Sequence, residues 1–277
     1  MVSKLGPFLS GDVVIATASA RPVLTFRNFS LRCDRSDPTV SFQTPWNWHC
    51  AQGKRIAVIT RNSFLRYQLI ASMSGAISPV AGEIIGNSVI GWPVGGEGGL
   101  DRKLRISHAV NFLSTIYSDC LMQSRVSMDE FWGLLEGMKI HPQIILKELS
   151  RDQKSFFYLA LSVFFSFDCY LIPSSTYLMS KKAERLRDLL LKQIEGKTLF
   201  ATSSDLQFQR MFCSEGLVLG SLGQILFSGS LSEAIQWSDQ NLEASSLMPP
   251  EDDMFSMNLN MSNLESSDDS MLSLIHI

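Results

Sequence analysis

Three short runs of apolar residues constrain the fold of this chain most strongly. They cover residues 55–59, 169–172 and 198–201 and read RIAVI, CYLI and TLFA. Uninterrupted apolar runs of this length are typical of parallel strands that are buried on both faces. A helical pattern follows each run, so the order of elements predicts a mixed α/β protein built on a parallel sheet.

The spacing of polar and apolar residues predicts the remaining elements. Residues 23–31 alternate as a half-buried strand does, and the five glycines and one proline within 91–99 predict a loop. Trp46 and Trp48 could pack in the core or form an exposed contact, and packing is the favoured alternative. Further strands are expected at 39–42, within 82–90, at 217–219 and at 224–227, and helices at 64–73, 107–118, 127–137, 153–167, 181–194 and 205–212.

Charge divides the 277 residues into unlike parts. Residues 241–277 hold seven acidic residues and no lysine or arginine, whereas the whole chain has a formal charge of −3. The remaining body is weakly positive, which gives no sign of the dense basic face that nucleic-acid binding requires. We expect an N-terminal extension at 1–20, one domain at 21–236 with a helical subdomain at about 101–165, and an acidic, disordered tail at 237–277.

Several simple classes of protein are disfavoured by the sequence. The five cysteines are odd in number, widely spaced and without a CxxC pair, which favours thiols used as small apolar residues in a reducing compartment. The most apolar stretch, residues 156–172, is interrupted by Asp168 and is too short to span a membrane. Asp12 lies where the apolar part of a secretory signal would be. We therefore expect a soluble, cytoplasmic protein.

Several motifs resemble those of ABC-transporter ATPases. Residues 53–59 (GKRIAVI) lead into a helix where a phosphate loop would lie, and residues 75–84 (GAISPVAGEI) are similar to the stretch that follows that loop. Residues 149–153 (LSRDQ) stand where the LSGGQ signature would be, followed by residues 167–172 (FDCYLI). Residues 89–99 (VIGWPVGGEGG) resemble a glycine-rich loop of one branch, the ATP-binding subunits of capsular-polysaccharide, O-antigen and teichoic-acid exporters.

This resemblance covers residues 21–236 and implies a fold. It implies an α/β fold of the ABC ATPase type, which is a P-loop NTPase with a RecA-like core. An antiparallel β edge from the N-terminal region and a helical subdomain would complete it.

The resemblance also implies positions for a phosphate loop of the form G-x-x-G-x-G-K-[ST]. In that loop the glycines let backbone N–H groups wrap the phosphates, the lysine neutralises them and the hydroxyl holds Mg²⁺. The corresponding positions here are Thr60, Arg61, Asn62, Ser63, Phe64, Leu65, Arg66 and Tyr67, followed by Gln68. None of the glycines is present, Arg66 keeps the positive charge, and Tyr67 replaces the compact hydroxyl. The residues favour a plain strand–turn–helix without a ligand.

At the other positions implied by the resemblance, the family's functional residues are also replaced. The metal-holding Asp and the catalytic Glu correspond to Pro173 and Ser174. The signature positions are Ser150, Arg151, Asp152 and Gln153, where Arg151 and Asp152 replace glycines. The Gln of the glycine-rich loop corresponds to Asp101, the switch His to Ser204, and the adenine-stacking aromatic residue to about Cys33. We expect no resident metal and no cofactor, with ATP and Mg²⁺ bound only if the altered site still accepts them.

The resemblance, with these losses, predicts a catalytically degenerate subunit linked to polysaccharide or lipopolysaccharide export. Such a chain would act structurally or as a regulator, docked on a transmembrane permease or paired with a competent ATPase, and could form a dimer. It would be cytoplasmic or peripheral at the inner face of the cytoplasmic membrane. The loop at 101–105 (DRKLR) would contact the permease or be a solvated loop.

Two alternatives remain open from the residues. The chain could be a soluble scaffold or regulator in polysaccharide biosynthesis. It could also be an ATPase with a non-standard site that binds nucleotide weakly through Arg66.

Overall fold

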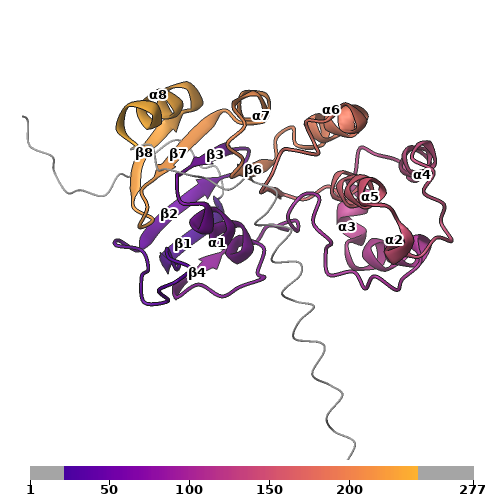
Figure 1. Cartoon of the computed structure of the whole chain (residues 1–277), viewed down its shortest axis with the longest axis horizontal. Coiled ribbons are helices and arrows are strands. Elements are labelled where there is room, and N and C mark those ends of the chain that lie inside the picture. Colours follow the sequence, from indigo (N-terminus) through magenta and orange to yellow (C-terminus); the bar gives the residue numbers. More distant parts are fainter. Residues whose placement is uncertain (1–21, 243–277) are drawn as a thin grey trace, which may run out of the picture.

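The computed structural model describes residues 22–242, so the predictions for residues 1–20 and for most of the acidic tail lie outside it. Its strands are β1 (Pro22–Ser30), β2 (Trp46–Ala51), β3 (Arg55–Ile59), β4 (Ala81–Ile85), β5 (Cys169–Ile172), β6 (Thr198–Ala201), β7 (Glu215–Leu219) and β8 (Ile225–Ser230). Its helices are α1 (Ser63–Met73), α2 (Ile106–Ile116), α3 (Ser118–Met122), α4 (Met128–Gly137), α5 (Arg151–Phe164), α6 (Glu184–Gln193), α7 (Leu206–Phe212) and α8 (Leu231–Asn241), with 3₁₀ turns η1 (Leu146–Glu148) and η2 (Lys181–Ala183). Figure 1 shows most strands with α1, α7 and α8 on one side and helices α2 to α5 on the other.

The central five-stranded sheet has the order β5-β6-β3-β7-β8. Its first four strands are parallel, and β8 pairs antiparallel with β7. The three apolar runs are β3, β5 and β6, and β5 and β6 are buried along their whole length, so the predicted parallel sheet is confirmed. Because these strands are adjacent and parallel, their carboxyl ends open onto one edge of the sheet, where α/β proteins place ligands.

A second, antiparallel sheet has the order β2-β1-β4. Trp46 at the start of β2 is 3% exposed, and its indole Nε1 donates to the Gly223 carbonyl over 2.7 Å. Its ring lies 5.5 Å from that of Phe26 and 5.2 Å from that of Phe42. The predicted packing of Trp46 is therefore confirmed, and this aromatic cluster joins the antiparallel sheet to the β7–β8 hairpin.

The strand predicted at 39–42 is wrong. Only Ser41 forms a β-bridge there, with Arg32. Turn chemistry explains the difference, since the Asp37 carboxylate accepts hydrogen bonds from both the backbone N–H and the hydroxyl of Thr39. The strand that the pattern misses is β2.

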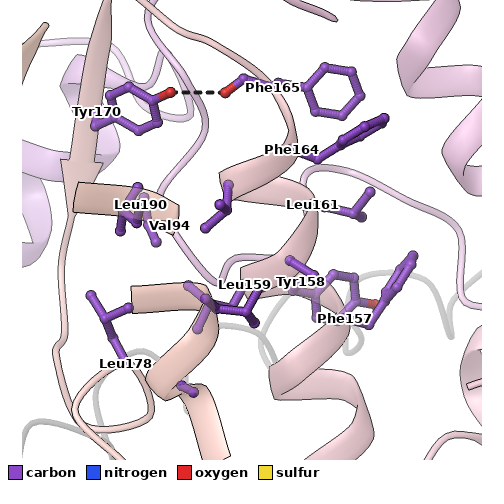
Figure 2. Close-up of a cluster of buried hydrophobic side chains, with 14 of the residues drawn as sticks. Val94, Phe157, Tyr158, Leu159, Leu161, Phe164, Phe165, Tyr170, Leu178 and Leu190 are labelled. Atoms are coloured by element: carbon purple, nitrogen blue, oxygen red, sulfur yellow. Dashed lines mark hydrogen bonds between the residues drawn. The ribbon is translucent and has the colours of Figure 1, made fainter. Parts of the chain in front are cut away.

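The phenylalanine-rich helix α5 contributes most of its residues to the larger of the two hydrophobic core clusters. It begins at a capping box in which Ser150 and Gln153 each satisfy the other's backbone N–H. Every residue from 156 to 164 is buried, so the predicted core role is confirmed. The helix ends at Phe164, earlier than predicted, because Phe165 is extended and its carbonyl accepts the Tyr170 hydroxyl over 2.9 Å (Figure 2).

Helix α8 is not predicted by the sequence pattern, and it crosses the expected domain boundary after residue 236. Its capping box pairs Ser230 with Glu233, a signal that can be read from the sequence. The helix packs closely against β7. Gly216 makes this possible, since a Cβ there would come within 2.2 Å of the Ala234 Cβ. The described chain therefore stays helical to Asn241, five residues past that boundary.

Candidate functional site

The phosphate-loop positions are split between a short connection and a helix. Strand β3 ends at Ile59 and α1 begins at Ser63, so only Thr60, Arg61 and Asn62 connect them. The remaining positions, from Ser63 to Gln68, lie on α1 itself. Beyond the first turn of a helix, the backbone N–H groups bond to carbonyls four residues earlier and are not free for a ligand.

Asn62 caps this helix and ties it to two other segments. Its side-chain oxygen accepts the Leu65 N–H over 2.9 Å. Its side-chain nitrogen donates to the carbonyls of Cys33, over 2.7 Å, and Ser221, over 2.9 Å. The Asn62 backbone N–H in turn donates to the Thr60 hydroxyl over 3.2 Å. One side chain thus links the loop after β1, the start of α1 and the β7–β8 turn.

Arg66 points inward from α1 toward the end of β6. Arg66 is only 8% exposed, and its Nη1 donates to the Thr202 carbonyl over 3.3 Å. The pocket beside it has a volume of about 190 Å³ and is also lined by Thr60, Arg61 and Ser204. Pockets for drug-sized ligands and cofactors usually measure about 300–1,000 Å³. This pocket is therefore small for a nucleotide.

Hydroxyl groups join the loops that follow β5 and β6. The Ser175 and Ser203 hydroxyls lie 2.8 Å apart, and the Thr202 hydroxyl donates to the Pro173 carbonyl over 3.3 Å. Asp205 is used as the N-cap of α7, where its carboxylate accepts two backbone N–H groups. Within residues 22–242, no group of three or more His, Cys, Asp and Glu side chains is placed to hold a metal ion.

The signature positions lie at the start of α5. Ser150 is the N-cap, Arg151 and Asp152 occupy the first turn, and Gln153 completes the capping box. The Asp152 carboxylate pairs with Lys182. Ser150, Arg151 and Asp152 line a cavity of about 990 Å³ that also contacts Pro173 and Ser174. The Gln153 side chain instead donates to the Met138 and Lys139 carbonyls.

The structure thus brings the predicted positions together in two separate groups. Thr60, Arg61, Arg66 and Ser204 share the small pocket, whereas Ser150, Arg151 and Asp152 share the larger cavity with Pro173 and Ser174. The other phosphate-loop positions and Gln153 line neither of the two. Asp101 lines neither of these two; its carboxylate accepts the Lys103 N–H over 2.8 Å, which shapes an exposed turn.

A buried serine holds the glycine-rich loop at 91–99 in place, and sequence reasoning missed it. The Ser162 hydroxyl, on α5, accepts the Trp92 Nε1 over 3.2 Å and the Gly95 N–H over 3.1 Å. Gly91 is required for close approach, since a Cβ there would lie 2.5 Å from the Phe167 ring. The available signal was a small polar residue within the apolar run at 156–164 of α5.

The five cysteines are free and buried, as predicted. Burial raises the pKa of Cys50 to about 12 and, despite the nearby Arg55, that of Cys213 to about 12. A thiolate is the reactive form of cysteine, so these two thiols are unreactive near neutral pH. Among the described residues, no helix is both long and apolar enough to cross a membrane.

Solved structures with the same fold are ABC ATPases. A structure described as the ATP-binding subunit of an ABC transporter covers 86% of this chain and 99% of its own length, with a TM-score of 0.55 and 14% identity. A dimeric ATP-binding cassette in a post-hydrolysis state bound to ADP and phosphate covers 75% of this chain and 98% of its own, with a TM-score of 0.57 and 16% identity. The predicted ABC ATPase fold is therefore confirmed.

Curated relatives come from the branch that the motifs indicated. The polysialic acid transport ATP-binding protein KpsT of Escherichia coli is 28% identical over 209 residues, which cover 71% of this chain and 94% of KpsT. The capsule polysaccharide export ATP-binding protein CtrD of Neisseria meningitidis is 25% identical, over 61% of this chain and 76% of CtrD. ATP-binding protein BexA of Haemophilus influenzae is 25% identical, over 62% of this chain and 78% of BexA. No family model matches the chain.

Proposed function

We propose that this chain is an ATP-binding-cassette subunit of a polysaccharide export transporter, with a structural or regulatory role in place of ATP hydrolysis. Its similarity to KpsT, CtrD and BexA supports the transport pathway. The local structure at the phosphate-loop positions supports the absence of hydrolysis. The first line of support rests on similarity over 61–71% of the chain, and the second rests on a few residues.

The cap that Asn62 forms on α1 carries the proposal. A phosphate would need free backbone N–H groups in the loop before α1 or in its first turn. Here the Asn62 side chain occupies the Leu65 N–H, and the Asn62 carbonyl accepts the Arg66 N–H over 3.2 Å. Opening a loop at this place would break four hydrogen bonds of Asn62, each worth on the order of 1 kcal/mol. The charge of Arg66 is directed at a backbone carbonyl.

The end of β5 supports the same conclusion about chemistry. Phosphoryl transfer needs a carboxylate to hold Mg²⁺ and a residue to orient the attacking water. Pro173 and Ser174 offer neither a carboxylate nor a base, and the neighbouring Ser175 hydroxyl is hydrogen-bonded to the Ser203 hydroxyl. We infer that this segment holds the two loops together.

Calorimetric titration of the purified chain with MgATP tests the proposal. We expect no binding with a Kd below about 100 µM, which corresponds to roughly −5.5 kcal/mol. Tighter binding that weakens in the Arg66→Gln variant would instead establish the alternative of a non-standard nucleotide site. The variant is compared with wild type by thermal unfolding, so that misfolding is not mistaken for lost affinity.

We further propose that α2 docks on the transmembrane permease. Phe112 and Ile116 are 53% and 55% exposed on one face of α2, and Met122 at the end of α3 is 78% exposed. This helix directly follows the loop at 101–105, for which the sequence left open either a permease contact or a solvated loop. Exposed apolar side chains that gather beside such a loop mark an interaction surface.

The double variant Phe112→Ser, Ile116→Ser should lose membrane association. Apolar contacts with the permease would be removed, and we expect the fraction that sediments with native-host membranes to fall at least fivefold at unchanged melting temperature. Leu206→Ser with Met211→Ser, whose side chains are 47% and 38% exposed on α7, is the matched control. Wild-type protein that stays entirely in the soluble fraction would refute permease docking and support the soluble-scaffold alternative.

A further inference from the structure

A cavity of about 990 Å³ opens between the start of α5, the loop after β5 and η2. Its floor is apolar and contains Val94, Leu159 and Leu178, which Figure 2 shows converging from three segments of the chain. Leu159 and Leu178 are both 3% exposed, so this floor is fixed by the core. An apolar floor with a few polar groups above it is the usual make-up of a ligand site, and the volume is within the usual range.

Positive charge dominates the polar part of this cavity. Its charged lining residues are Arg151, Asp152, Lys181 and Lys182. Asp152 pairs with Lys182, and that pair is neutral. Within residues 22–242, no carboxylate forms an ion pair with Arg151 or Lys181. Two positive charges therefore remain uncompensated at one cavity.

Hydroxyl groups supply the remaining polar surface. Ser174 and Thr176 line the cavity with their hydroxyls 3.4 Å apart.

We propose that this cavity binds a sugar-sized organic anion, whose carboxylate or phosphate contacts Arg151 and Lys181 and whose hydroxyl groups contact Ser174 and Thr176. The proposal goes beyond the transport subunit role and does not depend on it.

Calorimetric titration of the full chain at low salt tests this site with glucuronate, glucose 6-phosphate, inorganic phosphate and glucose as probes. We expect glucuronate or glucose 6-phosphate to bind with a submillimolar Kd, and glucose not to bind. Binding of glucuronate would indicate carboxylate recognition, and binding of glucose 6-phosphate would indicate phosphate recognition. Arg151→Gln with Lys181→Gln should weaken the binding about tenfold, since two charge-assisted contacts are lost.

The control variant Lys147→Gln, Lys192→Gln removes the same charge from exposed positions outside the cavity. It should leave the Kd within twofold of the wild-type value. Equal weakening by both double variants would show general electrostatic attraction and overturn the proposal. The proposal would also be overturned if neither sugar anion binds, or if inorganic phosphate binds as tightly as the sugar anion does. Tight MgATP binding that requires Arg66 would count against the proposed function and leave this site unaffected.

Discussion

Replacing Phe164 by alanine is expected to lower the free energy of unfolding by about 3–5 kcal/mol. Phe164 is fully buried, and its ring stacks on Phe131 of α4 with centroids 4.4 Å apart. It also meets the Phe165 ring at 5.1 Å. Truncation removes a large apolar side chain and leaves a cavity at the contact between α4 and α5, which the rigid surroundings fill only in part.

Chemical denaturation of the variant and of Phe112→Ala measures this effect. Phe112 is the same residue type at 53% exposure, so its truncation should change stability by less than about 0.5 kcal/mol. A loss at Phe164 as small as that at Phe112 would mean that the aromatic contact between α4 and α5 does not stabilise the fold as described.

Replacing Asn62 by alanine is expected to cost about 2–4 kcal/mol. Loss of the helix cap accounts for about 1 kcal/mol. The carbonyls of Cys33 and Ser221 lose their donors, and each lost hydrogen bond adds about 0.5–1.5 kcal/mol. The cost is large for a single polar residue because Asn62 connects three segments that are distant in the sequence.

Denaturation of Asn62→Ala beside Asn111→Ala isolates this effect. Asn111 is exposed on α2, and none of the described hydrogen bonds uses its side-chain amide, so the control should change stability by less than about 0.5 kcal/mol. A loss below that limit at Asn62 would show that the helix start opens readily. The structural basis for excluding phosphate would then fail.

The parallel sheet could be predicted from the sequence, because strands buried on both faces leave uninterrupted apolar runs such as residues 55–59. Strand β2 was missed, although its less exposed residues alternate at Trp46, Trp48 and Cys50. Helix α8 was missed because its apolar face is short and its dominant sequence signal is the capping box at Ser230.

The candidate site could be predicted only in part. Which residues occupy the family's positions can be read from the motifs, and the replacement of glycines by Ser63 and Leu65 already disfavours an open loop. What those residues do could not be predicted. The bonds of Asn62 to Cys33 and Ser221 join residues 29 and 159 positions apart, and tertiary folding alone brings them together. The cavity at Arg151 likewise combines three segments distant in the chain.

Phosphate release by the purified full-length chain in MgATP is the most direct test of the central claim, that this cassette does not hydrolyse ATP. We expect the rate to equal that of buffer without protein, because Pro173 and Ser174 offer no group that could hold Mg²⁺ or activate water. The account would be contradicted by ATPase activity that co-elutes with the protein on size exclusion and that is lower in a folded Arg66→Gln variant.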